Sequence, residues 1–167
     1  MRFLIAAVLV LSLGCSPKEL PEDTDEIKSL TAKQAAELVA TLDGDWLSLA
    51  GLTSIDKDVA HQLSKFEAPL SLDGLTSIDK DVLQELAKLE GELSLDSLTS
   101  IDKDVAQELA KFKAEKLSLN GLTSIDKDVA QELGKFKGKT LSLSAKALQT
   151  YEEVNGESPS VRSGGMF

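Results

Sequence analysis

The chain has 167 residues and a formal charge of −10 at pH 7. This acidity argues against nucleic acid and bare anionic membrane as general partners, because both repel an acidic protein. The sequence contains no glycine-rich phosphate loop, no paired-histidine zinc motif and no nucleophile elbow, so it predicts neither an enzyme nor a bound cofactor.

Residues 1–14 have the pattern of an export signal. Arg2 gives a positive start, and the apolar run that follows over 3–13 is too short to span a bilayer. The run ends at Cys15, and the stretch 11–15 (LSLGC) resembles the lipobox of bacterial lipoproteins. The resemblance implies a lipid, such as palmitate, on the sulfur of Cys15; an unpaired cysteine in an exported chain favours the same interpretation, since exported cysteines normally pair. The alternative is an ordinary signal peptide whose cysteine lies there by chance.

The residues after the signal indicate where the protein is located and how it is tethered. Ser16 stands where an aspartate would, in the enterobacterial sorting rule, hold a lipoprotein in the inner membrane. The resemblance therefore implies a cell-envelope location at the outer membrane, on its periplasmic or surface face. The lipid on Cys15 would hold the protein at the membrane. Residues 15–29 are rich in proline and acidic side chains and are expected to form a flexible tether.

The segment 30–46 is expected to be an N-terminal cap, a degenerate first repeat. A helix should run from Thr31 to about Leu42, because Thr31 and Gln34 can form a capping box and Gly44 is a typical terminator. Together with Trp46, this helix should shield the open end of the repeats that follow.

Four near-copies of one unit of 23 or 24 residues fill the middle of the chain. The phrase LTSIDKDV occurs unchanged in every copy, so the register of the repeat is unambiguous. A fixed period of this size indicates one supersecondary unit per copy, each burying its apolar face against its neighbours. The copies span 47–69, 70–92, 93–116 and 117–140.

Each copy changes its apolar period once. Leu47 and Leu49 alternate with a serine, as in a short strand with both leucines on one face. From Val59 to Phe66 the apolar spacing is four and then three, as on one stripe of a helix. Asp56 precedes this helix and can cap its first amide groups. The pattern predicts strand, turn, extended corner, a helix of about three turns and a return loop in every copy.

The pattern L-x-L-x-x-L-x-x-I-D-x-x-V-x-x-x-L-x-x-F over 47–143 resembles the leucine-rich repeat, nearest its cysteine-containing subclass. The resemblance implies an α/β solenoid, with short parallel strands on a concave side and helices on a convex side. Where that family usually has Asn or Cys, this chain has leucine, which removes the family's polar ladder and predicts an all-apolar seam. The leucines concerned are Leu52, Leu75, Leu98 and Leu122.

Two surfaces are candidate binding sites. The family commonly binds ligands on the concave side, where the resemblance places Ser71, Asp73, Ser94, Asp96, Ser118 and Asn120. A basic strip gathers on the return loops of the third and fourth copies, from Lys111, Lys113, Lys116, Lys135, Lys137 and Lys139. It could meet an acidic protein or a surface glycan. The alternatives are that the serines simply solvate a narrow sheet and that the lysines form a solvated rim.

Two further features allow a chemical interpretation. The motif Asp-Lys-Asp recurs at the start of each predicted helix, and stacked carboxylates could bind calcium, but the glycine-rich calcium turn and the EF-hand spacing do not occur. Helix capping explains the same residues, and no metal is predicted. His61 occupies a position that is glutamine in the other copies, which is typical of a solvated side chain rather than of a catalytic base.

The C-terminal cap is expected over 141–154, with a last strand followed by a helix from Ala145 that places Leu148 and Tyr151 on the core. Residues 155–167 are rich in Gly, Ser and Pro and are expected to be a disordered tail. The whole chain resembles a bacterial leucine-rich-repeat lipoprotein, which implies a non-catalytic protein that binds another protein or a cell-surface component. The alternatives are a structural spacer of the cell envelope without a specific ligand and a calcium-binding repeat protein.

Overall fold

The computed structural model describes residues 23–42 and 46–159. The predicted export signal, the lipidation site Cys15, the greater part of the tether, Gly44 and the last eight residues lie outside this part of the chain. The described residues form an α/β structure with one five-stranded parallel sheet in the order β1-β2-β3-β4-β5. The strands are β1 (Leu47–Ser48), β2 (Leu70–Ser71), β3 (Glu92–Ser94), β4 (Lys116–Leu119) and β5 (Thr140–Leu143).

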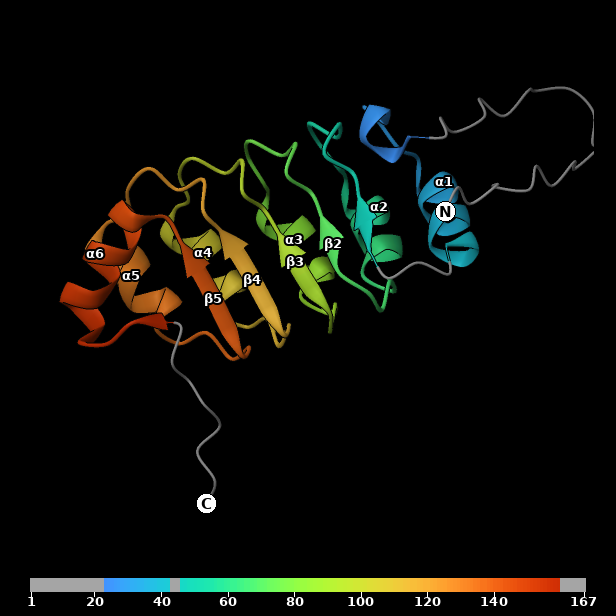
Figure 1. Ribbon diagram of the computed structural model, residues 1–167. Helices are drawn as coiled ribbons and strands as arrows, with labels where there is room; N and C mark the ends of the chain where they lie inside the picture. The colour runs from blue at the N-terminus through green and yellow to red at the C-terminus, as the bar shows by residue number, and fades with distance from the viewer. Residues whose placement is uncertain (1–22, 43–45, 160–167) are drawn as a thin grey trace, which may run out of the picture.

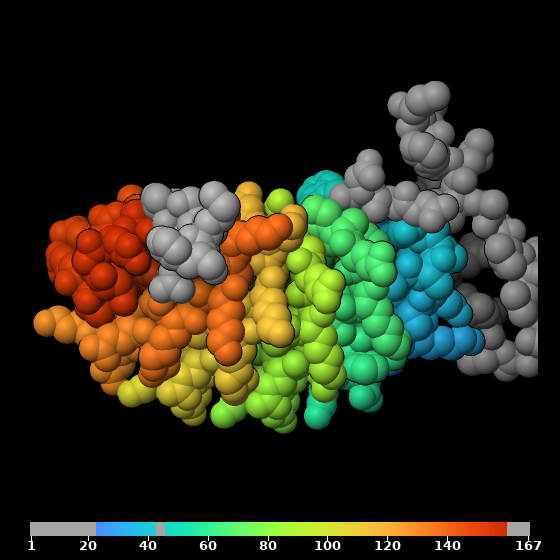
Figure 2. All heavy atoms as spheres, turned by 90° about the horizontal axis from the view of Figure 1, so that it is seen from below, coloured from blue at the N-terminus to red at the C-terminus, as the bar shows by residue number. Residues whose placement is uncertain are grey.

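Helices alternate with the strands and lie on one face of the sheet (Figure 1). Each of the four inner helices follows one strand and precedes the next, so each sequence copy supplies one strand and one helix; Figure 2 shows the copies as successive bands along the molecule. The helices are a short 3-10 turn η1 (Thr24–Glu26), then α1 (Ala32–Thr41), α2 (Lys57–Leu63), α3 (Lys80–Leu86), α4 (Lys103–Leu109), α5 (Lys127–Leu133) and α6 (Ala145–Asn155).

The register of the sheet follows the sequence repeat. Leu47 pairs with Leu70, Leu70 with Leu93, Leu93 with Leu117, and Leu117 with Leu141. Equivalent positions therefore stand beside one another through the whole sheet, as the fixed period predicts. Strands β1 and β2 begin at the first of the alternating leucines, and β3, β4 and β5 begin one residue before it.

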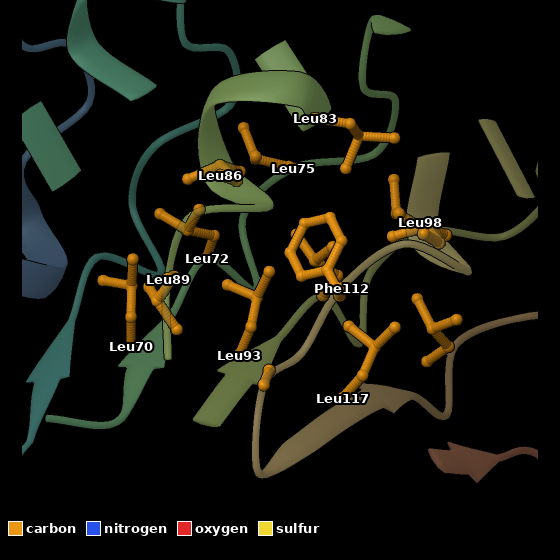
Figure 3. Close-up of a cluster of buried hydrophobic side chains, with 14 of the residues drawn as sticks. Leu70, Leu72, Leu75, Leu83, Leu86, Leu89, Leu93, Leu98, Phe112 and Leu117 are labelled. Carbon is orange, nitrogen blue, oxygen red and sulfur yellow. The ribbon is translucent and has the colours of Figure 1, made fainter. Parts of the chain in front are cut away.

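The core is a set of aligned apolar columns between the sheet and the helices. The predicted apolar seam of Leu52, Leu75, Leu98 and Leu122 is confirmed, since none of these side chains is more than 1% exposed. Full burial of a leucine contributes about 1.5–3 kcal/mol. Phe112 is the largest fully buried side chain and lies among leucines of the second and third copies, including Leu93 (Figure 3).

Three of the four inner helices begin with the predicted aspartate cap. The carboxylates of Asp56, Asp102 and Asp126 each accept a hydrogen bond of 2.8 Å from the backbone N–H three residues later. Asp79 occupies the same position before α3 but makes no such bond. The helices are also shorter than the three turns expected: each has seven residues, which is about two turns, because the chain already turns back at the next residues.

The N-terminal cap is partly as predicted. Helix α1 begins after Thr31, whose side chain and that of Gln34 form the predicted capping box, and it packs beside α2. Trp46 does not shield the end of the repeats, however, because it is 62% exposed. Instead η1 lies against β1, where Asp25 receives hydrogen bonds from the strand and from the turn after it.

The C-terminal cap extends further than predicted. Ala147 and Tyr151 are buried beneath α6, whereas Leu148 lies outside the core, because it sits next to Ala147 on the helix and projects from a different face. Asn155 ends α6 and donates its side-chain N–H to the backbone oxygens of Ala130 (2.9 Å) and Tyr151 (3.0 Å). Pro159 is buried. Residues 155–159, assigned above to a disordered tail, thus belong to the folded body.

Candidate functional site

The predicted concave residues are brought together on the strand face, the face of the sheet away from the helices, and they bond to one another. Asp73 is the centre of the first group. Its Oδ2 accepts the hydroxyl of Ser71 at 2.7 Å, and its Oδ1 accepts the hydroxyl of Ser94 at 2.7 Å and the backbone N–H of Asp96 at 2.8 Å. One carboxylate therefore links the second copy to the third.

Asp96 repeats this role one copy later. Its Oδ1 accepts the hydroxyl of Ser118 at 2.7 Å and the backbone N–H of Asn120 at 2.8 Å. The Asn120 side-chain amide donates to Asp96 Oδ2 at 3.2 Å and to Ser118 Oγ at 2.7 Å. Almost every polar atom that the resemblance offers for ligand binding here is thus engaged within the protein.

Asp25 supplies a rung that the sequence reasoning missed. It lies in η1, before the first copy, and accepts the hydroxyl of Ser48 and, at 3.2 Å, the backbone N–H of Ala50. We call Asp25, Asp73 and Asp96 with their donors the carboxylate ladder. The seam itself is apolar, as the leucines predict, and the polar ladder that the sequence did not indicate runs instead along the strand face.

The ladder accounts for the serine stripe. Ser48, Ser71 and Ser118 are no more than 8% exposed. The simpler alternative, in which the serines only solvate the sheet, is therefore wrong for these three. Burial alone would raise the pKa of Asp73, but the bonds from Ser94, Asp96 N–H and Ser71 outweigh it and leave the pKa below its ordinary value. The ionised carboxylate is therefore the form that the fold selects.

Replacing Asp73 with alanine should lower the free energy of unfolding by about 2–3 kcal/mol, because two half-buried serine hydroxyls and one N–H lose their acceptor. Asp73→Asn keeps an acceptor oxygen and should lose less. Urea unfolding followed by circular dichroism measures both. An alanine variant as stable as the wild type would mean that the ladder does not hold the copies together.

A second set of polar contacts lies on the helix face, around one glutamate in each of the last three copies. Lys88, just beyond the end of α3, pairs with Glu85, and His61 Nδ1 from the preceding copy lies 2.8 Å from Glu85 Oε2. Glu108 pairs with Lys111 at 2.8 Å and with Lys80 of the preceding copy at 3.6 Å. These glutamates join neighbouring helices through charge.

The fourth copy repeats this arrangement: Glu132 pairs with Lys135 at 2.7 Å. The hydrogen bonds from the lysines lower the pKa of Glu108 and Glu132, and they are the largest cause in each case. For Glu85, the bonds from Lys88 and His61 lower the pKa from the ordinary 4.5 to about 2. His61 was expected to be a solvated side chain; it is half exposed, but its ring is held by Glu85.

Stability should fall on acidification, and Glu85 should contribute to the loss. Because its pKa is lower in the folded chain, its contribution is complete above pH 4.5 and is lost as the pH falls toward about 2. Glu85→Gln should make the decline in the urea midpoint shallower over this range, and the first copy, with Gln62 at the same place, indicates that the change is tolerated. An unchanged slope would contradict this role.

The basic strip is mostly neutralised within the protein. Lys111 and Lys135 belong to the glutamate pairs, Lys139 pairs with Glu115, and Lys116 lies 3.9 Å from Glu92. Within the described part of the chain, Lys113 and Lys137 form no ion pair. Sequence reasoning located the lysines but overlooked their acidic partners, which come from neighbouring loops and helices.

The remaining chemistry is limited. In residues 23–42 and 46–159, no three side chains of the His, Cys, Asp and Glu types converge to hold a metal ion. No helix in the same part of the chain is both long and apolar enough to cross a membrane. The first aspartate of each Asp-Lys-Asp motif occupies the N-cap position of its helix, and the second is exposed in the first helical turn.

Comparison of the chain with protein-family models, with curated proteins and with solved structures finds no match.

Proposed function

We propose that the chain is a non-catalytic lipoprotein of the bacterial cell envelope, anchored through Cys15, whose leucine-rich-repeat-like solenoid binds another protein or a surface glycan. The observation that carries the proposal is the in-register pairing of one strand from every copy, because it makes a long, regular surface from a short repeat. Arrays of this kind serve mainly as interaction surfaces. The export signal and lipobox resemblance of residues 1–15 support the anchor.

A structural spacer is the second candidate, and the carboxylate ladder favours it. The strand-face side chains that a ligand would need are already bonded across the copies. Most of the basic strip is likewise paired with glutamates. Under this proposal the polar residues hold successive copies together, and the folded body acts only as a spacer at the membrane.

The anchor is tested by expressing the full chain in a bacterial host with an alkyne fatty acid. Wild-type protein should acquire the label and sediment with membranes, and Cys15→Ala should do neither. A wild-type chain that remains unlabelled, or an alanine variant that labels equally, would rule out lipidation at Cys15.

Interaction and spacing are distinguished by a photo-crosslinking residue placed at one exposed position per surface. Asn120 tests the strand face, Lys137 the return loops and Asp104 the first turn of α4. Binding predicts a discrete cross-linked species from one surface only. Equal background from all three positions would favour the spacer.

A further inference from the structure

We propose that a groove between the corners of the second and third copies, where each chain segment passes from strand to helix, binds a short segment of a partner protein that carries an apolar side chain next to a lysine or arginine. The site is separate from the strand face and the basic strip. It rests on the proposed interaction role, for which it supplies a location and a partner chemistry.

The groove has a volume of about 320 Å³. Its floor is apolar and its rim is polar. The lining residues are Ser77, Ile78, Ser100, Ile101, Asp102 and Val105. Val105 is 8% exposed, whereas the equivalent Val59 and Val129 are each 1% exposed, so the first turn of α4 is more accessible than its counterparts. This volume lies at the small end of the range of ligand pockets, roughly 300–1,000 Å³, and suits a few side chains rather than a folded domain.

A departure from the repeat explains why the corner is open here. Three copies have glycine three residues after the strand serine, at Gly51, Gly74 and Gly121, but the third copy has Ser97 there. A Cβ at Gly121 would lie 1.9 Å from the backbone oxygen of Asp96, and one at Gly74 would lie 2.3 Å from that of Ala50. Ser97 carries a Cβ, so the third copy must stand further from the second at this turn.

The next junction shows the closed alternative. Between the third and fourth copies, the backbone N–H and the hydroxyl of Thr123 both bond to the backbone oxygen of Thr99, at 3.0 and 3.1 Å. Ile125 is then only 8% exposed, while Ile78 and Ile101 at the open junction remain partly exposed. Gly121 stands at the closed corner and Ser97 at the open one. Glycine alone does not close a corner, because Ile55 at the first junction is also partly exposed although the second copy carries Gly74.

A second departure falls at the same junction. Leu83 of α3 replaces the alanine found at Ala60, Ala106 and Ala130, and it is fully buried. Figure 3 shows Leu83 on the side of α3 toward Leu98 of the third copy. A larger side chain between successive helices separates them, so the same two copies are held apart on the helix side as well.

Charge selects the kind of partner. The corners carry Asp79 and Asp102, both exposed, and Asp79 is not engaged in capping its helix. The intervening lysines are directed elsewhere: Lys80 Nζ lies 3.6 Å from Glu108, and Lys103 Nζ lies 3.4 Å from Asp128. An apolar floor beside exposed carboxylates complements an apolar side chain with an adjacent cation. The two isoleucines favour a peptide over a glycan, whose hydroxyls the floor could not satisfy.

Display selection of random octapeptides on the purified folded protein tests the proposal without assuming a sequence. We expect enriched peptides to pair Leu, Ile, Val or Phe with a neighbouring Lys or Arg. Chemical shifts of the Ile78 and Ile101 methyl groups should change on titration with the best peptide. Enrichment of acidic peptides, no enrichment, or shifts confined to the strand face would overturn it.

Two matched variants sharpen the test. Asp102→Asn keeps an N-cap, because asparagine caps as well as aspartate, but removes the rim charge; it should weaken binding roughly fivefold, the size of one exposed ion pair. Asp56→Asn makes the same change at the N-cap of α2, outside the residues that line the groove, and should leave binding unchanged. Ser97→Gly should let the corner close and reduce binding further. Equal effects of the two asparagine variants would place the peptide elsewhere. Cross-linking at Asn120 and Lys137, which do not line the groove, reports on partner binding independently of it.

Discussion

Phe112→Ala is expected to lower the free energy of unfolding by about 3–5 kcal/mol, as large-to-small replacements of fully buried aromatic side chains do. The side chain is 0% exposed and lies in the middle of the row of copies, between leucines of two neighbouring units. The cavity left behind cannot be filled from the chain ends, because every surrounding column is itself held in register by the sheet. Urea unfolding monitored by far-ultraviolet circular dichroism measures the loss.

Phe112→Leu is the matched control. The second copy carries Leu89 at the same place and buries it to 1% exposure, so leucine fits this position of the unit and should cost much less than alanine. Copies in such an array contact only their neighbours, so a defect in the centre can also uncouple the two halves. A reduced denaturant slope in the alanine variant would reveal this uncoupling. Losses of equal size in the two variants would contradict the cavity argument.

Gly121→Ala is expected to cost about 3 kcal/mol, at the upper end for overpacking, because the new Cβ would meet a backbone oxygen that has little freedom to move. The separation would be 1.9 Å from Asp96 O, and Asp96 is fixed by its own rung of the carboxylate ladder. The same unfolding experiment measures the loss.

Ser97→Ala is the control for this prediction. It removes a hydroxyl at the equivalent position but retains a Cβ that the third copy already accommodates, so stability should change by less than about 0.5 kcal/mol. If Gly121→Ala were equally harmless, the close approach of successive turns would not explain the glycine. The groove at the second junction would then need another cause than Ser97.

The sequence predicts the regular part of the fold well, because each element is encoded several times. The strand starts at Leu47 and Leu70, and the helix starts after Asp56 and Asp102, follow from two simple periods and a cap. The length of the helices was overestimated because the apolar stripe continues to Phe66 although the last turn is not helical.

The candidate sites were predicted less well, because their roles depend on partners from other copies. Asp25 lies 23 residues from Ser48, and His61 lies 24 residues from Glu85. A separation near the repeat length was the available signal: any polar residue has neighbours one period away, and Asp73 with Ser94 or Lys103 with Asp128 could have been paired on this basis. The repeat gives no such signal for the exposure of Trp46 or for the missing cap at Asp79. Trp46 occurs once, and Asp79 stands in the same sequence motif as the aspartates that do cap their helices.

The direction of the carboxylate ladder bears on how such a chain can grow. Each main rung places its acceptor in one unit and takes its donors, a serine hydroxyl and a backbone N–H, from the unit that follows. Asp25 offers the first unit the same acceptor that Asp73 offers the third. A further copy of the second or third unit, inserted directly after either one by tandem duplication of its gene segment, would therefore find a carboxylate acceptor in the unit before it and present a new one to the unit after it. Length is thus the property of this protein that evolution can alter with the least repair elsewhere.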